Sequence, residues 1–152
     1  MDKKGFLLAE ETLKVVIAAI CIVFLIVLII AVYNAVTGAK KTEQAQENLN
    51  RINDIIASLE NGENENQDIA NPEGWYLLGF IYGDKPNSCL NNNCLCICKG
   101  TDAEKCDKRG KGSCLIITNL TNSNLGIKIK GPSDLTFINI KKQDNKILIT
   151  GV

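Results

Sequence analysis

The stretch VVIAAICIVFLIVLIIAVYNAV, from Val15 to Val36, carries no charged residue over 22 positions. A helix of this length, rising about 1.5 Å per residue, crosses the roughly 30 Å hydrocarbon core of a bilayer. The run is apolar on every side, which is typical of a membrane span and not of a surface helix. In lipid each backbone group must pair within the segment, so the run is predicted to be helical despite its β-branched residues.

A secretory signal peptide is the main alternative for this run. The run is longer than the about 7 to 15 residues of a usual signal core, and no small-x-small cleavage pattern ends it. We therefore predict a single membrane-spanning helix, and we interpret Cys21 within it as a small apolar residue.

The composition argues against several classes of function. The 152-residue chain carries 17 Lys and Arg against 17 Asp and Glu, so no net charge favours nucleic acid as a partner. Histidine is absent, which removes the commonest general base and the commonest metal ligand. The sequence has no Gly-x-Ser-x-Gly elbow, no phosphate-binding loop and no paired carboxylates in its strand-rich region. We therefore predict that the protein is not an enzyme and needs no cofactor.

The charges around the span leave its orientation nearly tied. Lys3 and Lys4 precede the apolar run, and Lys40 and Lys41 follow it closely. Clustered cysteines in the second half of the chain favour an oxidising compartment and decide the orientation. The N-terminus is predicted to be cytoplasmic and the C-terminal part extracytoplasmic, where the sequon Asn119-Leu120-Thr121 would matter only if it is exported.

Beyond the span, apolar residues recur at steps of four and three residues, which predicts an amphipathic helix over residues 37–61. The stripe comprises Ala45, Leu49, Ile52, Ile56 and Leu59. Such a stripe must pack against another copy's helix or against the chain's own C-terminal domain. The pair Thr37-Gly38 is a point where the helix could loosen, and Asn61-Gly62 is a C-cap signal. The polar, turn-rich residues 62–74 are predicted to form a linker.

Residues 75–152 are predicted to form a small Cys-rich antiparallel β domain. The segment contains short runs rich in Ile, Leu and aromatic residues, each bounded by Gly, Asn, Pro or Asp. Residues 143–146 look like the turn of a terminal hairpin. The chain is thus predicted to be α+β, with a long N-terminal helix before a small sheet. A sheet of this size is hard to stabilise by apolar burial alone, so it needs cross-links.

Six cysteines provide candidates for those cross-links. They are Cys89, Cys94, Cys96, Cys98, Cys106 and Cys114. The middle three alternate, so they share one face if that stretch is a strand, where neighbours lie about 7 Å apart at Cα and are poorly placed to bond each other. Each is expected to form a disulfide with a different partner among the outer three, although six cysteines allow fifteen pairings. A four-thiolate zinc site is the alternative, but its usual CxxC pairs are missing. Free thiols are the third possibility.

The architecture resembles that of a type IV pilin or pseudopilin, and the N-terminus strengthens the resemblance. Members of this family carry a class III signal peptide: a basic leader ending in Gly, then a Phe-like residue, with a Glu at the fifth place. Here Lys3-Lys4-Gly5 is followed by Phe6, and the fifth residue counted from Phe6 is Glu10. The motif covers about nine residues, and the architecture covers the whole chain.

The resemblance implies a processing site and an assembly contact. A prepilin-type peptidase would remove the leader, residues 1–5, by cutting between Gly5 and Phe6, so that residues 6–36 form the mature apolar helix. Glu10 would pair with the Phe6 amine of a neighbouring copy as subunits assemble. The expected function is that of a structural subunit of an extracellular type IV pilus-like filament or pseudopilus. The expected partners are the membrane, other copies or related subunits, and the peptidase.

Two residues depart from the family pattern. Glu11 and Lys14 lie where family members generally keep apolar residues. Glu10 and Lys14 are four residues apart and could form a helical ion pair at the membrane interface. The alternative is therefore an uncleaved single-pass membrane protein that displays a small disulfide-stapled β domain as a binding module.

Overall fold

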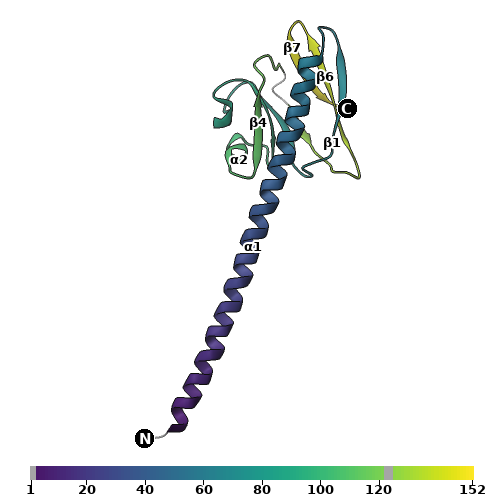
Figure 1. The fold of residues 1–152 in the computed structure, drawn as a ribbon. Helices are drawn as coiled ribbons and strands as arrows, with labels where there is room; N and C mark the ends of the chain where they lie inside the picture. Colours follow the sequence, from purple (N-terminus) through teal and green to yellow (C-terminus); the bar gives the residue numbers. More distant parts are fainter. Residues whose placement is uncertain (1–2, 122–124) are drawn as a thin grey trace. The chain divides into compact units, whose positions relative to one another are not determined.

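The computed structural model describes residues 3–121 and 125–152, with side chains described from Thr12 onward (Figure 1). The chain divides into two compact units, Met1–Thr37 and Gly38–Val152. The elements in chain order are α1 (Lys3–Ser58), β1 (Asn64–Ile69), β2 (Tyr76–Phe80), the 3-10 helix η1 (Asn87–Cys89), β3 (Cys94–Cys98), α2 (Ala103–Asp107), β4 (Gly112–Ile116), β5 (Gly126–Lys128), β6 (Thr136–Gln143) and β7 (Lys146–Gly151). This arrangement confirms the predicted α+β class.

The apolar part of α1 is helical and uncovered by the rest of the chain. Its most apolar window has a mean hydropathy of 3.7, and none of that window is buried. Phe24 and Ile29 are each 64% exposed. The Thr37 hydroxyl donates to the carbonyl oxygen of Tyr33 at 2.8 Å, so this polar side chain is paired within the helix. The segment is long and apolar enough to cross a membrane.

The second part of α1, from Gly38 to Ser58, packs into a core of the same chain. Ala45, Leu49 and Ile52 are fully buried, and they belong to one apolar cluster with residues of both sheets. Of the two partners predicted for the stripe, the structure shows the chain's own β domain. Helix α1 is continuous at Gly38, whose carbonyl oxygen accepts a hydrogen bond from the Thr42 hydroxyl at 3.0 Å.

The strands form two antiparallel sheets and not the single sheet that the sequence predicted. One has the order β1-β6-β7 and the other β4-β3-β2-β5. From Thr136 to Ile140, strand β6 alternates buried residues with exposed or half-buried ones, as a sheet with one solvated face requires. All five residues of β3 are buried, because both of its faces are covered. The helix stripe and one face of each sheet share the main core.

The segment predicted to be a linker, residues 62–74, contains strand β1. Its register with β6 runs from Asn64 opposite Lys141 to Ile69 opposite Thr136. Only Ile69 within the strand is buried. Because β1 is an edge strand held by main-chain pairing, it needs no apolar alternation, and its polar sequence looked like a loop.

The hairpin predicted near the C-terminus is present. Strands β6 and β7 pair up to Gln143 opposite Lys146. The two turn residues, Asp144 and Asn145, have φ values of 50° and 62°. Asp and Asn tolerate the left-handed region better than most residues do, which suits them to a two-residue hairpin turn.

Candidate functional site

Strand β3 separates two chemically different cores. Its alternation places Cys94, Cys96 and Cys98 on one face and Leu95 and Ile97 on the other. The two aliphatic residues belong to the main core with the helix stripe. The three cysteines form a second buried cluster together with Leu78, Cys89 and Cys106. The structure therefore confirms the prediction that these three cysteines lie on one face of the strand.

The structure contains three disulfides, and they link Cys89 to Cys94, Cys96 to Cys114 and Cys98 to Cys106. Each strand cysteine thus bonds a different outer cysteine. Cys96 and Cys114 are direct register partners on β3 and β4, with their Cα atoms 4.1 Å apart. The other two disulfides attach η1 and α2 to the strand. Within the described chain, Cys21 is the free cysteine, and it is exposed on α1.

The three disulfides lie close to one another. The Cys96 sulfur is 3.9 Å from that of Cys89 and 3.8 Å from that of Cys94. The sulfurs of Cys96, Cys98 and Cys106 also lie within 4.8 Å of one another. Such sets have the spacing of metal ligands, but zinc binds thiolates, and a sulfur held in a disulfide is not a thiolate. The zinc alternative would therefore require the reduced protein.

Polar contacts attach the two short helices to each other. The Asp107 carboxylate at the end of α2 accepts hydrogen bonds from the backbone N–H of Asn87 at 2.7 Å and of Ser88 at 3.3 Å. At the start of α2, the Lys105 ammonium forms an ion pair with the Asp102 carboxylate at 2.8 Å. The hydrogen bond and charge of Lys105 lower the pKa of the Asp102 carboxyl. Both side chains are exposed, so this is a surface ion pair that supports the local helix.

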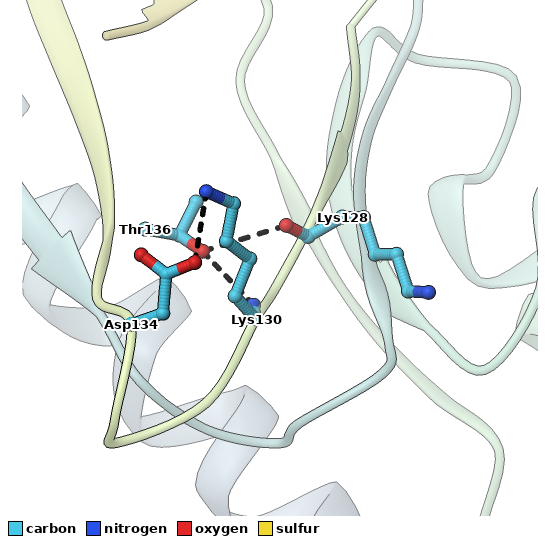
Figure 2. Close-up of polar contacts among 4 residues, drawn as sticks. All are labelled: Lys128, Lys130, Asp134 and Thr136. Carbon is cyan, nitrogen blue, oxygen red and sulfur yellow. Dashed lines mark hydrogen bonds and ion pairs between the residues drawn. The ribbon is translucent and has the colours of Figure 1, made fainter.

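A second polar cluster lies where the chain passes from one sheet to the other (Figure 2). The backbone N–H of Lys130 donates to the Thr136 hydroxyl at 3.0 Å, and that hydroxyl donates to the Lys128 carbonyl oxygen at 3.4 Å. The Lys130 ammonium pairs with Asp134 at 3.0 Å. Thr136 is only 7% exposed, so its hydroxyl satisfies buried main-chain groups. The cluster holds the connection between β5 and β6 in place.

The side chains of the sequon residues Asn119 and Thr121 form hydrogen bonds with the backbone. The Asn119 amide donates to the Asn145 carbonyl oxygen at 2.7 Å, and the Thr121 hydroxyl donates to the Ile147 carbonyl oxygen at 2.9 Å. Both side chains therefore tie the 119–121 segment to the β6–β7 hairpin. The same residues that suggested a modification site serve as structural links here.

The backbone of the predicted processing and assembly residues, Gly5, Phe6 and Glu10, lies in α1. The side chains of Phe6 and Glu10 lie outside the described part of the structure. Comparison of the chain with protein-family models, with curated proteins and with solved structures finds no match.

Proposed function

We propose that the protein is a structural subunit of an extracellular type IV pilus-like filament or pseudopilus. One observation supports this most: a single helix is uncovered and apolar in its first part and packed into a disulfide-bonded β domain in its second. This architecture is that of a membrane-anchored extracellular module. The disulfides suit an oxidising compartment, in keeping with export of the β domain.

The exposed apolar surface of the helix favours a filament over a simple membrane anchor. Val15 and Tyr33, near the two ends of the run, are 69% and 67% exposed. In a bilayer, lipid covers this surface, but a subunit leaving the bilayer needs another cover for it. The same segment of neighbouring copies provides one, because every copy presents the same apolar surface. A bundle of these helices would place the β domains on its outside.

In this proposal Glu10 sets the register between copies. A carboxylate in hydrocarbon costs at least about 2.5 kcal/mol on insertion scales, so it needs a cationic partner. Cleavage after Gly5 would create such a cation, the new α-amine of Phe6. Cleavage and pairing are thus linked steps of one assembly process.

The second candidate is an uncleaved anchor that displays the β domain as a binding module. The charges of Glu11 and Lys14 favour it, because they suit a helix whose first turns lie among lipid headgroups. In both candidates the proposed role is not enzymatic, and the absence of histidine and of catalytic motifs supports this.

Intact-mass spectrometry of the protein from its native membrane tests the proposal. A mature chain beginning at Phe6 supports the filament subunit. A chain that retains Met1 or only loses it would leave the displayed module as the better explanation. The N-terminal fragment should be sequenced in the same experiment, because degradation elsewhere could mimic the mass change.

A further inference from the structure

The turn between α2 and β4 lies directly against α1 at Gly38. A methyl group placed on Gly38 would lie 3.4 Å from the carbonyl oxygen of Gly110. Gly110 has a φ of 74°, a conformation that side chains disfavour. The turn is closed by a hydrogen bond of 2.9 Å from the Lys111 N–H to the Lys108 carbonyl oxygen. Two glycines therefore let the turn backbone approach the helix backbone closely.

This contact gathers cations around one point of the structure. Five basic residues flank the two glycines, and all are exposed: Lys40, Lys41, Lys108, Arg109 and Lys111. Lys108 pairs with Glu104 at 3.0 Å, but that glutamate is 84% exposed. In the part of the chain that the structure describes, none of the other four forms an ion pair. The carboxylate of Asp107, which directly precedes Lys108, accepts two backbone N–H groups. Glu43, two residues after Lys41 on α1, is an exposed acid.

The same point lies at the end of the membrane-spanning run. Gly38 follows Val36 by two helical residues, a rise of about 3 Å. With the apolar run in a bilayer, Gly38 is therefore at the level where hydrocarbon gives way to headgroups. The turn at Gly110 is held at that level by its contact with Gly38.

We propose that these five cations form a basic collar that binds the phosphates of anionic phospholipid headgroups and holds the α2–β4 turn on the membrane surface. Arg and Lys are the side chains that bind phosphate, and an anionic surface attracts basic residues beside a membrane span. A lipid headgroup is the expected ligand because the membrane-spanning helix places the collar at the level of the headgroups. The inference rests on the membrane anchoring in the proposed function and not on filament assembly.

Lysine acetylation kinetics on the full chain in lipid nanodiscs test the collar. The discs contain phosphatidylcholine alone or an equal mixture with phosphatidylglycerol, and peptide mass spectrometry reports each lysine separately. Headgroup phosphates should shield the Lys111 amine and slow its acetylation roughly five-fold in the anionic discs, the change expected for about 1 kcal/mol per cation near an anionic surface. Raising the salt from about 0.1 M to about 1 M should remove the difference, because the Debye length falls from about 10 Å to about 3 Å.

Lys146 is the internal control, since it lies on the β6–β7 hairpin. The neighbouring Lys142 ammonium contacts the Leu59 carbonyl oxygen at 2.7 Å, and Leu59 lies about 30 Å along the helix from Gly38. That separation exceeds the Debye length, so the acetylation rate of Lys146 should not depend on the lipid. Arg109→Glu should abolish most of the Lys111 protection, whereas the matched variant Lys146→Glu should leave it unchanged. Circular dichroism and disulfide mapping would verify that both variants are folded.

Several results would overturn the collar. Equal slowing of Lys111 and Lys146 would show a general surface effect. If acetylation of Lys40 and Lys41 slows in anionic discs while that of Lys111 does not, the turn does not reach the lipid. Protection in neutral discs that grows with the number of copies per disc would assign the turn to a second copy. Failure to enter nanodiscs would refute the anchoring itself, whereas a failure of filament assembly alone would leave the collar standing.

Discussion

The ammonium of Lys142 on β6 lies 2.7 Å from the carbonyl oxygen of Leu59, just past the C-terminal end of α1. It also approaches the Ile56 carbonyl oxygen at 3.5 Å. The last carbonyl groups of a helix have no partner within the helix, and the helix dipole places partial negative charge there. A cation from a strand more than 80 residues later in the chain satisfies both requirements. This contact fastens the helix end to the three-stranded sheet.

Replacing Lys142 by Met should therefore destabilise the β domain while keeping the apolar stem of the side chain. We expect a loss of about 1 to 2 kcal/mol in the free energy of unfolding, because a charged hydrogen bond and a dipole interaction are removed. Denaturant unfolding of the full chain in detergent, followed by circular dichroism, measures this. Lys146→Met is the matched control, since Lys146 is exposed on the same hairpin. Equal losses for the two variants would contradict the proposed capping role.

The buried stripe of α1 predicts that truncating Leu49 lowers the free energy of unfolding more than truncating Leu148 does. Leu49 is fully buried in the core, whereas Leu148 on β7 is 40% exposed. Leu49→Ala should cost about 2 to 5 kcal/mol through lost burial and a cavity. Leu148→Ala should stay within about 0.5 kcal/mol, as for a surface substitution. Similar unfolding midpoints for both variants would mean that the helix is not packed on the β domain as the structure shows.

The disulfides predict how many thiols react. Alkylation of the denatured, non-reduced protein should modify one cysteine, Cys21, and peptide mapping should give the pairs Cys89–Cys94, Cys96–Cys114 and Cys98–Cys106. Each cross-link is expected to contribute about 2 to 4 kcal/mol, so reduction should unfold a domain of this size. Seven reactive thiols together with co-purified zinc would favour the metal site instead.

The apolar run predicts the fraction in which the protein is found. The chain should remain with membranes through washes with high salt and alkaline carbonate, which remove peripheral proteins but not a spanning helix. Immunoblotting of the washed membranes measures this. Recovery of the full chain in the supernatant would refute a spanning helix, as would a mature chain that begins after Val36.

Glu10 distinguishes the filament from the plain anchor. Glu10→Gln should leave insertion intact and should not block cleavage after Gly5, because it removes charge from the span and leaves the basic leader unchanged. Filament assembly should fail, since a buried amine left without its partner costs about 3 to 5 kcal/mol. A plain anchor should lose only the about 0.2 to 0.5 kcal/mol of an exposed helical ion pair. Electron microscopy and shear fractionation report assembly.

Glu11→Gln is the matched control for this experiment, because it makes the same chemical change one residue away. It should assemble normally if Glu10 alone sets the register. Normal filaments from the Glu10 variant, or an equal defect in both variants, would remove the reason for assigning the assembly contact to Glu10.

Features that depend on neighbouring residues alone were predictable. The run from Val15 to Val36 specifies a helix because no position is charged, nearly all are apolar, and lipid leaves the backbone no other partner. The spacing of Ala45, Leu49 and Ile52 specifies which side of the helix is buried, since the helical period is local. The alternation of the three strand cysteines specifies their common face for the same reason.

Features that depend on pairing between distant segments required the tertiary structure. The polar residues of β1 form a strand only because β6, about 70 positions away, offers its main-chain groups. The partner of each strand cysteine follows from where η1, α2 and β4 lie, because the spacing left open which outer cysteine each of them bonds. The contacts of Lys142 with Leu59 and of Gly110 with Gly38 leave no sequence pattern. A local period records which face of an element is buried, but only the folded chain decides what covers that face.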